Sequence, residues 1–210
     1  MIRFLFILTF LAVPFVHAAD TKPADGMWRT YDRKGNLDRE ENYRNKMLHG
    51  EIRAFYPSGA LRSVTQYMDG KRQGDEKTYY EKGGLAMESN YANNDMDGLS
   101  RHYYDTGELE REAFYKNGGL HGETKVYYKS GALKQQLPYK NGVLDGTALT
   151  FDEGGQVTME ENYKTGNLVN RKDYGTDSAG LLKGTPPAAP AAPKLDSKSA
   201  AADKPIQPPK

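Results

Sequence analysis

Residues 122–145, which read GETKVYYKSGALKQQLPYKNGVLD, contain the pattern that decides the fold. The pattern returns every 24 residues without drift, so six copies fill residues 26–169, and a seventh fails because Asn170 stands where glycine is due. A fixed period of this length is typical of a repeat architecture, in which each copy packs mainly against its neighbours. Positions within a copy are counted from its first glycine, position 0, which falls at Gly26, Gly50, Gly74, Gly98, Gly122 and Gly146.

Four further columns recur in all six copies. Glycine always stands at position 9, and tyrosine always stands at position 17, at Tyr43, Tyr67, Tyr91, Tyr115, Tyr139 and Tyr163. Position 5 is aromatic, at Tyr31, Phe55, Tyr79, Tyr103, Tyr127 and Phe151. Position 11 is aliphatic, at Leu37, Leu61, Leu85, Leu109, Leu133 and Val157. Aliphatic residues are otherwise scarce after the first twenty residues, so tyrosine must supply much of the buried surface.

Two β-prone runs and two turn signals make up each copy. Inner triplets such as Pro57-Ser58-Gly59 suit a type I turn followed by a glycine in the left-handed region. Outer dipeptides such as Asp69-Gly70 and Asn141-Gly142 are strong hairpin turns. We therefore predict an all-β fold, an elongated, twisted, single-layer array of six 24-residue β-hairpins with a disordered C-terminal tail.

The register within a hairpin has two readings. A three-residue inner turn pairs position 5 with position 11, for example Tyr103 with Leu109, whereas a two- or four-residue turn pairs position 3 with position 14, for example Arg101 with Glu112. Side chains alternate between the faces of a strand, so the shared parity of positions 5, 11 and 17 favours the first reading. That reading predicts all three apolar columns on one face of the sheet.

The candidate binding residues form two columns. Position 6 neighbours position 5 and should therefore point to the opposite face, where a single-layer sheet leaves side chains uncovered. Such an aromatic strip suits a partner because tyrosine offers contact area with little entropy loss; its members are Tyr56, Tyr80, Tyr104 and Tyr128. A nearby basic column could attract an acidic partner: Arg53, Lys77, Arg101 and Lys125. The alternative interpretation is that both columns are structural, through packing and cross-strand pairing.

Composition and motif searches argue against several functions. The formal net charge of +1 gives no field that would draw the chain to nucleic acid. The chain has no cysteine, and no metalloprotease, P-loop, dinucleotide-binding or nucleophile-elbow motif stands in it. His49 and His121 share a column but are three copies apart, too far to bind one metal ion. We predict a non-enzymatic protein without catalytic residues, cofactor or metal site.

Both ends of the chain differ from the repeats. Residues 1–18 read as a signal peptide, with Arg3, an apolar run and a cleavage site after Ala18; an uncleaved anchor is the alternative. A short linker, residues 19–25, leads to the repeat domain, residues 26–175. Residues 176–210 form a Pro/Ala/Lys-rich tail that holds seven of the 11 prolines and is predicted to be disordered. The mature protein is therefore expected in the periplasm or outside the cell.

The repeat columns resemble the MORN repeat in its bacterial variant form. The match rests on segments such as residues 122–133 and on Tyr139-Lys140-Asn141-Gly142. The resemblance implies an array of β-hairpins and a role in binding, and bacterial variants are often grouped with antitoxin or immunity proteins. We therefore expect an exported binding module or scaffold for a protein partner; the alternative is a binder of a cell-envelope ligand such as peptidoglycan, another glycan or anionic lipid. The oligomeric state is left open.

Overall fold

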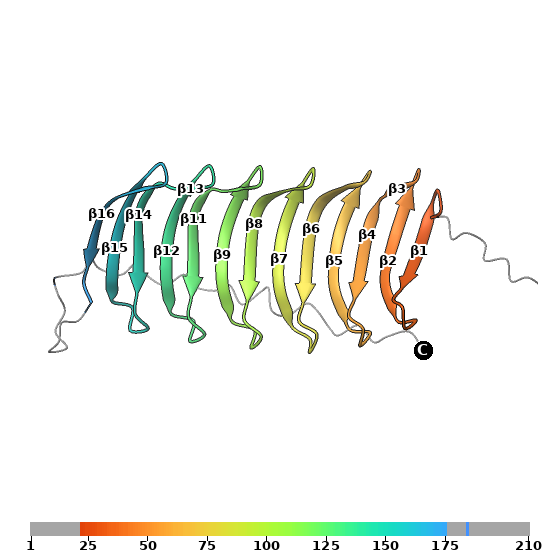
Figure 1. Cartoon of the computed structure of the whole chain (residues 1–210), viewed down its shortest axis with the longest axis horizontal. Coiled ribbons are helices and arrows are strands. Elements are labelled where there is room, and N and C mark those ends of the chain that lie inside the picture. The colour runs from red at the N-terminus through yellow and green to blue at the C-terminus, as the bar shows by residue number, and fades with distance from the viewer. Residues whose placement is uncertain (1–21, 176–183, 185–210) are drawn as a thin grey trace, which may run out of the picture.

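The computed structural model describes residues 22–175 and Gly184, and this part of the chain is built from strands in one open sheet (Figure 1). The predicted signal peptide and almost all of the predicted tail lie outside the described residues. Of the sixteen antiparallel strands in the described residues, thirteen pair in chain order and three short ones lie beside that path, and no second layer covers the sheet in the described part. The prediction of an all-β, single-layer array of six hairpins is confirmed. The described residues include no helix of the length and apolarity that a membrane crossing requires.

Every hairpin consists of a first strand and a return strand. The first strands are β1 (Gly26–Tyr31), β4 (Gly50–Phe55), β6 (Lys71–Tyr79), β8 (Asp95–Tyr103), β11 (Gly122–Tyr127) and β14 (Gly146–Phe151). The return strands are β2 (Leu37–Arg44), β5 (Leu61–Met68), β7 (Leu85–Ala92), β9 (Leu109–Lys116), β12 (Leu133–Lys140) and β15 (Val157–Lys164). The short strands β3 (Met47–Leu48), β10 (Gly119–Leu120) and β13 (Val143–Leu144) pair with β2, β9 and β12. A final strand, β16 (Asn167–Asp173), pairs with β15 and is exposed along its whole length.

The inner turns have the predicted geometry. In the second hairpin the Gly59 N–H donates to the Tyr56 carbonyl at 2.8 Å, and the Tyr56 N–H donates to the Ala60 carbonyl at 2.8 Å. Gly59 has φ +84°, as expected for a glycine that closes a type I turn in the left-handed region. In the first copy Asp32 replaces the position 6 tyrosine, and its Oδ1 accepts hydrogen bonds from the N–H groups of Lys34 and Asn36.

The outer turns have two successive residues with positive φ, as in type I′ hairpin turns. Asn141 and Gly142 have φ values of 53° and 84°. The Gly142 N–H also donates to the Leu120 carbonyl of the preceding outer turn at 2.8 Å, and the equivalent bond recurs at every outer turn. The outer turns therefore stack on one another and couple neighbouring hairpins. Lys46 occupies the glycine position of the first outer turn with φ 64°.

Both registers considered from the sequence occur in the same hairpin. Tyr103 pairs with Leu109, and Arg101 pairs with Glu112. The two are compatible because a β-bulge lies between them: His102 pairs with Arg111, so the return strand contains one extra residue, Glu110, at position 12. The same shift occurs in all six hairpins.

The bulge makes one prediction wrong. Positions 5 and 11 do lie on one face, but the alternation of side chains is broken at position 12, so the position 17 tyrosines lie on the other face. Tyr103, for example, bonds Glu88 at 2.8 Å on the first face, whereas Tyr115 accepts a bond from Arg111 at 3.1 Å on the second. We call the first the ion-pair face (positions 1, 3, 5, 11, 14 and 16) and the second the tyrosine face (positions 2, 4, 13, 15 and 17).

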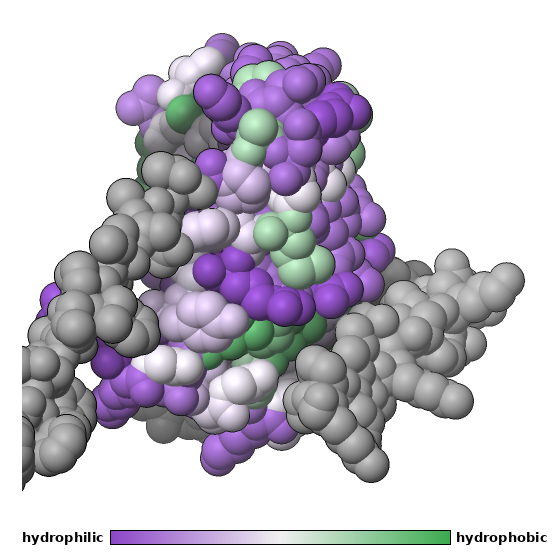
Figure 2. All heavy atoms as spheres, turned by 90° about the vertical axis from the view of Figure 1, so that its right-hand side faces the viewer, coloured by the Kyte–Doolittle hydropathy of each residue, from purple (hydrophilic) through white to green (hydrophobic). Residues whose placement is uncertain are grey.

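Burial on the tyrosine face depends on small side chains rather than on a thick apolar core. Positions 2 and 15 lie opposite each other across each hairpin. In the fourth hairpin they are occupied by Ser100 and Ala113, which are almost completely buried, at 2% and 1% exposed. Ser89 and Ser100 share a hydrogen bond of 2.7 Å between their hydroxyls. Seen from the β1 end, the described surface is mainly hydrophilic with scattered apolar patches (Figure 2).

The two ends of the array are closed differently. At the N-terminal end Glu41 is buried, and its carboxylate accepts hydrogen bonds from the Tyr43 hydroxyl (2.7 Å) and Lys22 (3.1 Å). Burial alone would raise the pKa of Glu41, but these two bonds and the charge of Arg39 hold that pKa below its ordinary value. At the C-terminal end Tyr174 packs with Phe151 and Val157 in a small apolar cluster.

The strain at Lys46 gives a stability test. We expect Lys46→Gly to raise the free energy of unfolding by about 1 kcal/mol, because glycine adopts a positive φ without the steric cost that a Cβ incurs. Urea unfolding of the purified chain measures the change. Lys34→Gly is the matched control, since Lys34 is an exposed turn lysine without a positive φ and its replacement should destabilise. Equal effects of the two substitutions would contradict the assignment of strain to Lys46.

Candidate functional site

The four position 6 tyrosines tie each hairpin to the next. Each stands at the start of an inner turn, half-buried, and its hydroxyl donates to a main-chain carbonyl in the following hairpin. The bonds are Tyr56 to Tyr79 (2.8 Å), Tyr80 to Tyr103 (2.6 Å), Tyr104 to Tyr127 (2.8 Å) and Tyr128 to Phe151 (2.8 Å). The sequence predicted that these residues form an uncovered aromatic strip. The structure shows that their hydroxyl groups also have a structural role.

The rings of these tyrosines remain partly accessible where the inner turns of successive hairpins lie side by side, at one end of the strands. We call this end of the strands the inner-turn edge. Lysine side chains lie over two of them: the Lys129 Nζ is 5.4 Å from the centroid of Tyr104, and the Lys134 Nζ is 5.3 Å from that of Tyr128. These distances fit cation–π contacts. The inner-turn edge therefore presents rings of fixed orientation, and their predicted role in partner binding stays a prediction.

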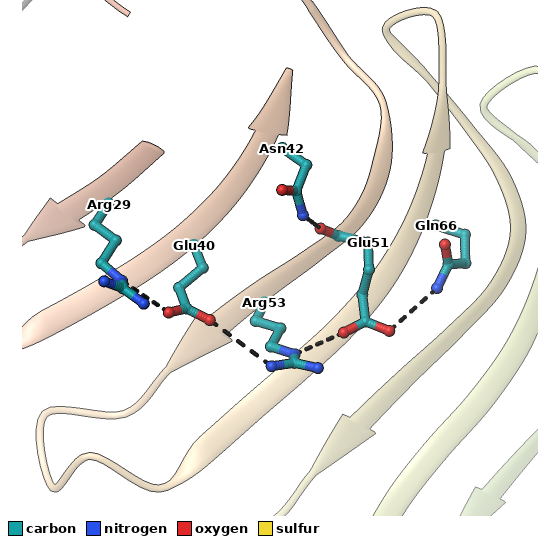
Figure 3. Close-up of polar contacts among 6 residues, drawn as sticks. All are labelled: Arg29, Glu40, Asn42, Glu51, Arg53 and Gln66. Atoms are coloured by element: carbon teal, nitrogen blue, oxygen red, sulfur yellow. Dashed lines mark hydrogen bonds and ion pairs between the residues drawn. The ribbon is translucent and has the colours of Figure 1, made fainter. Parts of the chain in front are cut away.

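Ion pairs neutralise the basic column. In Figure 3, Glu40 lies between Arg29 (2.9 Å) and Arg53 (3.9 Å), and Arg53 in turn contacts Glu51 at 2.6 Å. The other oxygen of Glu51 accepts a hydrogen bond from Gln66 at 3.4 Å. The contacts of Glu40 and of Gln66 cross between strands and the Arg53–Glu51 pair lies within β4, so acidic and basic groups alternate across the ion-pair face.

The same arrangement continues in the middle of the sheet. Arg101 contacts Glu112 at 2.8 Å and Glu88 at 3.2 Å, and Lys77 lies opposite Glu88 in the register of β6 and β7. Lys125 contacts Glu123 at 3.1 Å. The pairing of position 3 with position 14 was the register that the sequence did not favour, and it is this pairing that sets Lys77 and Arg101 opposite glutamates. It explains why the basic column does not form a patch of positive charge.

Tyr103 lies within this network as a neutral hydrogen-bond donor. Burial and the hydrogen bond to Glu88 raise the pKa of Tyr103 well above its ordinary value. Burial would lower the pKa of Arg101, but its hydrogen bonds to Glu112 and Glu88 raise it overall. Tyr103 therefore remains a neutral donor and Arg101 remains charged over the physiological pH range.

Two adjoining hollows lie on the ion-pair face, and both include Asp75 and Lys77 in their walls. One has a volume of about 290 Å³ and extends across β4 to β6; the other has a volume of about 220 Å³ and extends across β6 to β8. Together they form one shallow groove across three hairpins. Apolar side chains such as Leu61 and Leu99 contribute to the lining of this groove.

Four side chains of the column that precedes the position 0 glycines have a specific function in the turns. They accept hydrogen bonds from the first N–H of the next outer turn: Asn45 to Asp25 (2.8 Å), Asp69 to His49 (3.4 Å), Asn93 to Gln73 (3.0 Å) and Asn117 to Asp97 (3.3 Å). The signal was present in the sequence, because every residue in the column can accept a hydrogen bond. No group of three His, Asp or Glu side chains in residues 22–175 is arranged to hold a metal ion.

Comparison with protein families gives a match to the repeats themselves. A family model described as "MORN repeat variant" matches residues 24–45, 48–69, 72–93, 96–117, 120–141 and 144–165. The matched segments begin two residues before each position 0 glycine, so they follow the same six copies. No curated protein was found to be similar.

Loss of one tyrosine hydroxyl should weaken the coupling between hairpins. We expect Tyr104→Phe to lower the free energy of unfolding by about 1 kcal/mol, since the Tyr127 carbonyl loses its side-chain donor. Tyr31→Phe is the matched control, because Tyr31 is 60% exposed and its replacement should leave the unfolding midpoint almost unchanged. Indistinguishable midpoints for the two variants would show that the hydroxyl bond does not couple the hairpins.

The raised pKa of Tyr103 predicts a loss of stability at alkaline pH. Below pH 10 the phenol is neutral in both folded and unfolded chains; above pH 10 it ionises first in the unfolded chain, so rising pH favours unfolding. We expect Tyr103→Phe to reduce this alkaline loss of stability, as measured by urea unfolding at a series of pH values. An unchanged pH dependence in the variant would contradict the assignment.

Proposed function

Because the chain belongs to the MORN repeat variant family, whose repeats are generally associated with binding rather than catalysis, we propose that it is an exported, non-enzymatic binding module for a protein partner. The module acts as a scaffold in the periplasm or outside the cell. Occlusion of a toxic partner, as in an immunity protein, is one form of this function that the array suits.

The observation that supports this proposal is the fixed row of tyrosine rings at the inner-turn edge. Because each hydroxyl is already bonded within the sheet, the rings lose little conformational freedom when a partner packs against them. Neighbouring rings are one hairpin apart, about 9.6 Å for two strands. A protein surface that spans several hairpins can therefore contact the rings simultaneously.

Charge compensation on the ion-pair face indicates how such a partner is recognised. Arg53 and Arg101 are engaged by glutamates, so they contribute less long-range attraction than free cations would. In this proposal, contacts with Tyr56, Tyr80, Tyr104 and Tyr128 supply most of the affinity. The basic residues Arg53, Lys77, Arg101 and Lys125 supply orientation through hydrogen bonds at short range.

The test compares two triple variants in affinity capture from a cell-envelope extract. Replacing Tyr80, Tyr104 and Tyr128 by alanine removes rings and hydroxyls, whereas replacing them by phenylalanine removes only the hydroxyls. We expect the alanine variant to lose its partner, with an affinity reduced at least about tenfold, and the phenylalanine variant to retain it. Circular dichroism first confirms that both variants are folded. Capture of the same partner at the same affinity by a folded alanine variant would contradict the proposed surface.

A further inference from the structure

The groove on the ion-pair face is separate from the tyrosine rings. Its walls come mainly from positions 1, 3, 5, 11, 14 and 16 of the strands, whereas the position 6 tyrosines stand in the inner turns. The groove crosses the strands and follows the long axis of the array, because its two hollows adjoin at Asp75 and Lys77. A ligand that fills it must be extended and must contact several hairpins.

Opposite charges balance in the lining of the groove. Three acidic residues, Glu51, Asp75 and Glu88, face three basic residues, Arg53, Lys77 and Arg101. Two acid–base contacts are short: Arg53 to Glu51 at 2.6 Å and Arg101 to Glu88 at 3.2 Å. The lining carries no net charge, so it does not select for an anion such as a phosphate group or a strongly charged peptide.

The polar groups of the groove retain hydrogen-bonding capacity. A carboxylate offers about four acceptor sites, and Glu51 uses its two oxygens for one contact each, with Arg53 and with Gln66. Asp75 is exposed and accepts a hydrogen bond from Asn90. The partners hold these side chains in place, so the groove presents an ordered set of acceptors and donors that a ligand rich in hydroxyl groups can match.

Apolar side chains in and beside the groove complete the site. Leu61, Val64 and Tyr79 line one hollow and Leu99 lines the other. Leu99 pairs across the hairpin with Phe114, an aromatic residue that is 43% exposed on the same face. Polar groups combined with an exposed aromatic ring suit a sugar, whose hydroxyls bond in its plane and whose C–H groups pack against apolar surface.

We propose that this groove binds a linear, uncharged polysaccharide whose chain lies along the array. Each hairpin advances the surface by about 9.6 Å, a length close to that of a disaccharide unit in an extended β-1,4-linked chain. Successive disaccharides therefore meet successive carboxylate and amide groups, from Glu51 and Gln66 through Asp75 and Asn90. Phe114 stacks against a sugar ring at the C-terminal end of the groove.

An extended peptide fits the groove less well. Peptides that bind sheets usually pair with an exposed strand edge through main-chain hydrogen bonds. The groove lies on a face, where the main-chain groups of β4 to β9 already pair with neighbouring strands. Side-chain donors and acceptors are what this surface offers, and a polyhydroxylated chain uses them most fully.

The test measures binding of the full chain to defined oligosaccharides by calorimetry, with the β-1,4-linked hexamers and dimers of N-acetylglucosamine and of glucose as probes. We expect a hexamer to bind at least about tenfold more tightly than its dimer, because it spans more than one hollow. High salt should leave the affinity almost unchanged, since the ligand is uncharged. Failure of both hexamers to bind at millimolar concentration, or equal affinity for hexamer and dimer, would overturn the proposal.

Variants assign the binding to the groove. Phe114→Ala and Asp75→Asn should each weaken hexamer binding about fivefold or more. Leu168→Ala, in exposed strand β16, and Glu81→Gln, in an exposed inner turn, are the matched controls and should bind as the native chain does. Equal binding by groove variants and controls, or binding of an uncharged decapeptide in preference to the hexamers, would overturn the proposal. The substituted groove residues lie outside the tyrosine row. Failure of the oligosaccharide test would therefore not affect the result of the affinity capture, and the two proposals can fail separately.

Discussion

The hydrogen bond from each position 6 tyrosine to the next hairpin is the interaction on which the array depends. Six residue pairs join β8 and β9 within the fourth hairpin, but only two, Lys125 with Glu112 and Val126 with Arg111, join β9 to β11 of the fifth. A short ladder of this kind leaves the two ends of neighbouring hairpins in need of another connection. The tyrosine hydroxyl supplies one at the inner turns from the second hairpin on, and the stacked outer-turn N–H groups supply the other.

A single layer without a facing sheet requires an unusual distribution of side chains. On the tyrosine face, serine, threonine and alanine are buried among the larger side chains around them, so the face is closed without bulky aliphatic residues. On the ion-pair face, alternating charges neutralise one another at spacings set by the strands. Both solutions fit a chain that is rich in tyrosine and charged residues and poor in isoleucine, valine and leucine.

The sequence predicted the repeat, the hairpins and the turn types, because each depends on local chemistry such as the glycine of the inner turns and the Asn-Gly or Asp-Gly pairs of the outer turns. It did not predict the faces correctly, because the bulge at position 12 changes the alternation of side chains and has no local signal. The candidate tyrosines were identified as a column, but their bonds to carbonyls such as that of Tyr79 could not be predicted without the relative position of neighbouring hairpins. The groove was missed for the same reason.

The regular pairing of positions 13–16 with positions 1–4 limits how the length of a repeat can change. Deletion of one residue from this paired segment would shift the register by one residue and turn the side chains on one side of it to the opposite face. One insertion in the same strand would displace the tyrosine at position 17 from its column. Indels in this segment are therefore costly in evolution, whereas duplication or loss of a whole 24-residue unit preserves both surfaces, and lineages of such proteins should vary in copy number rather than in unit length.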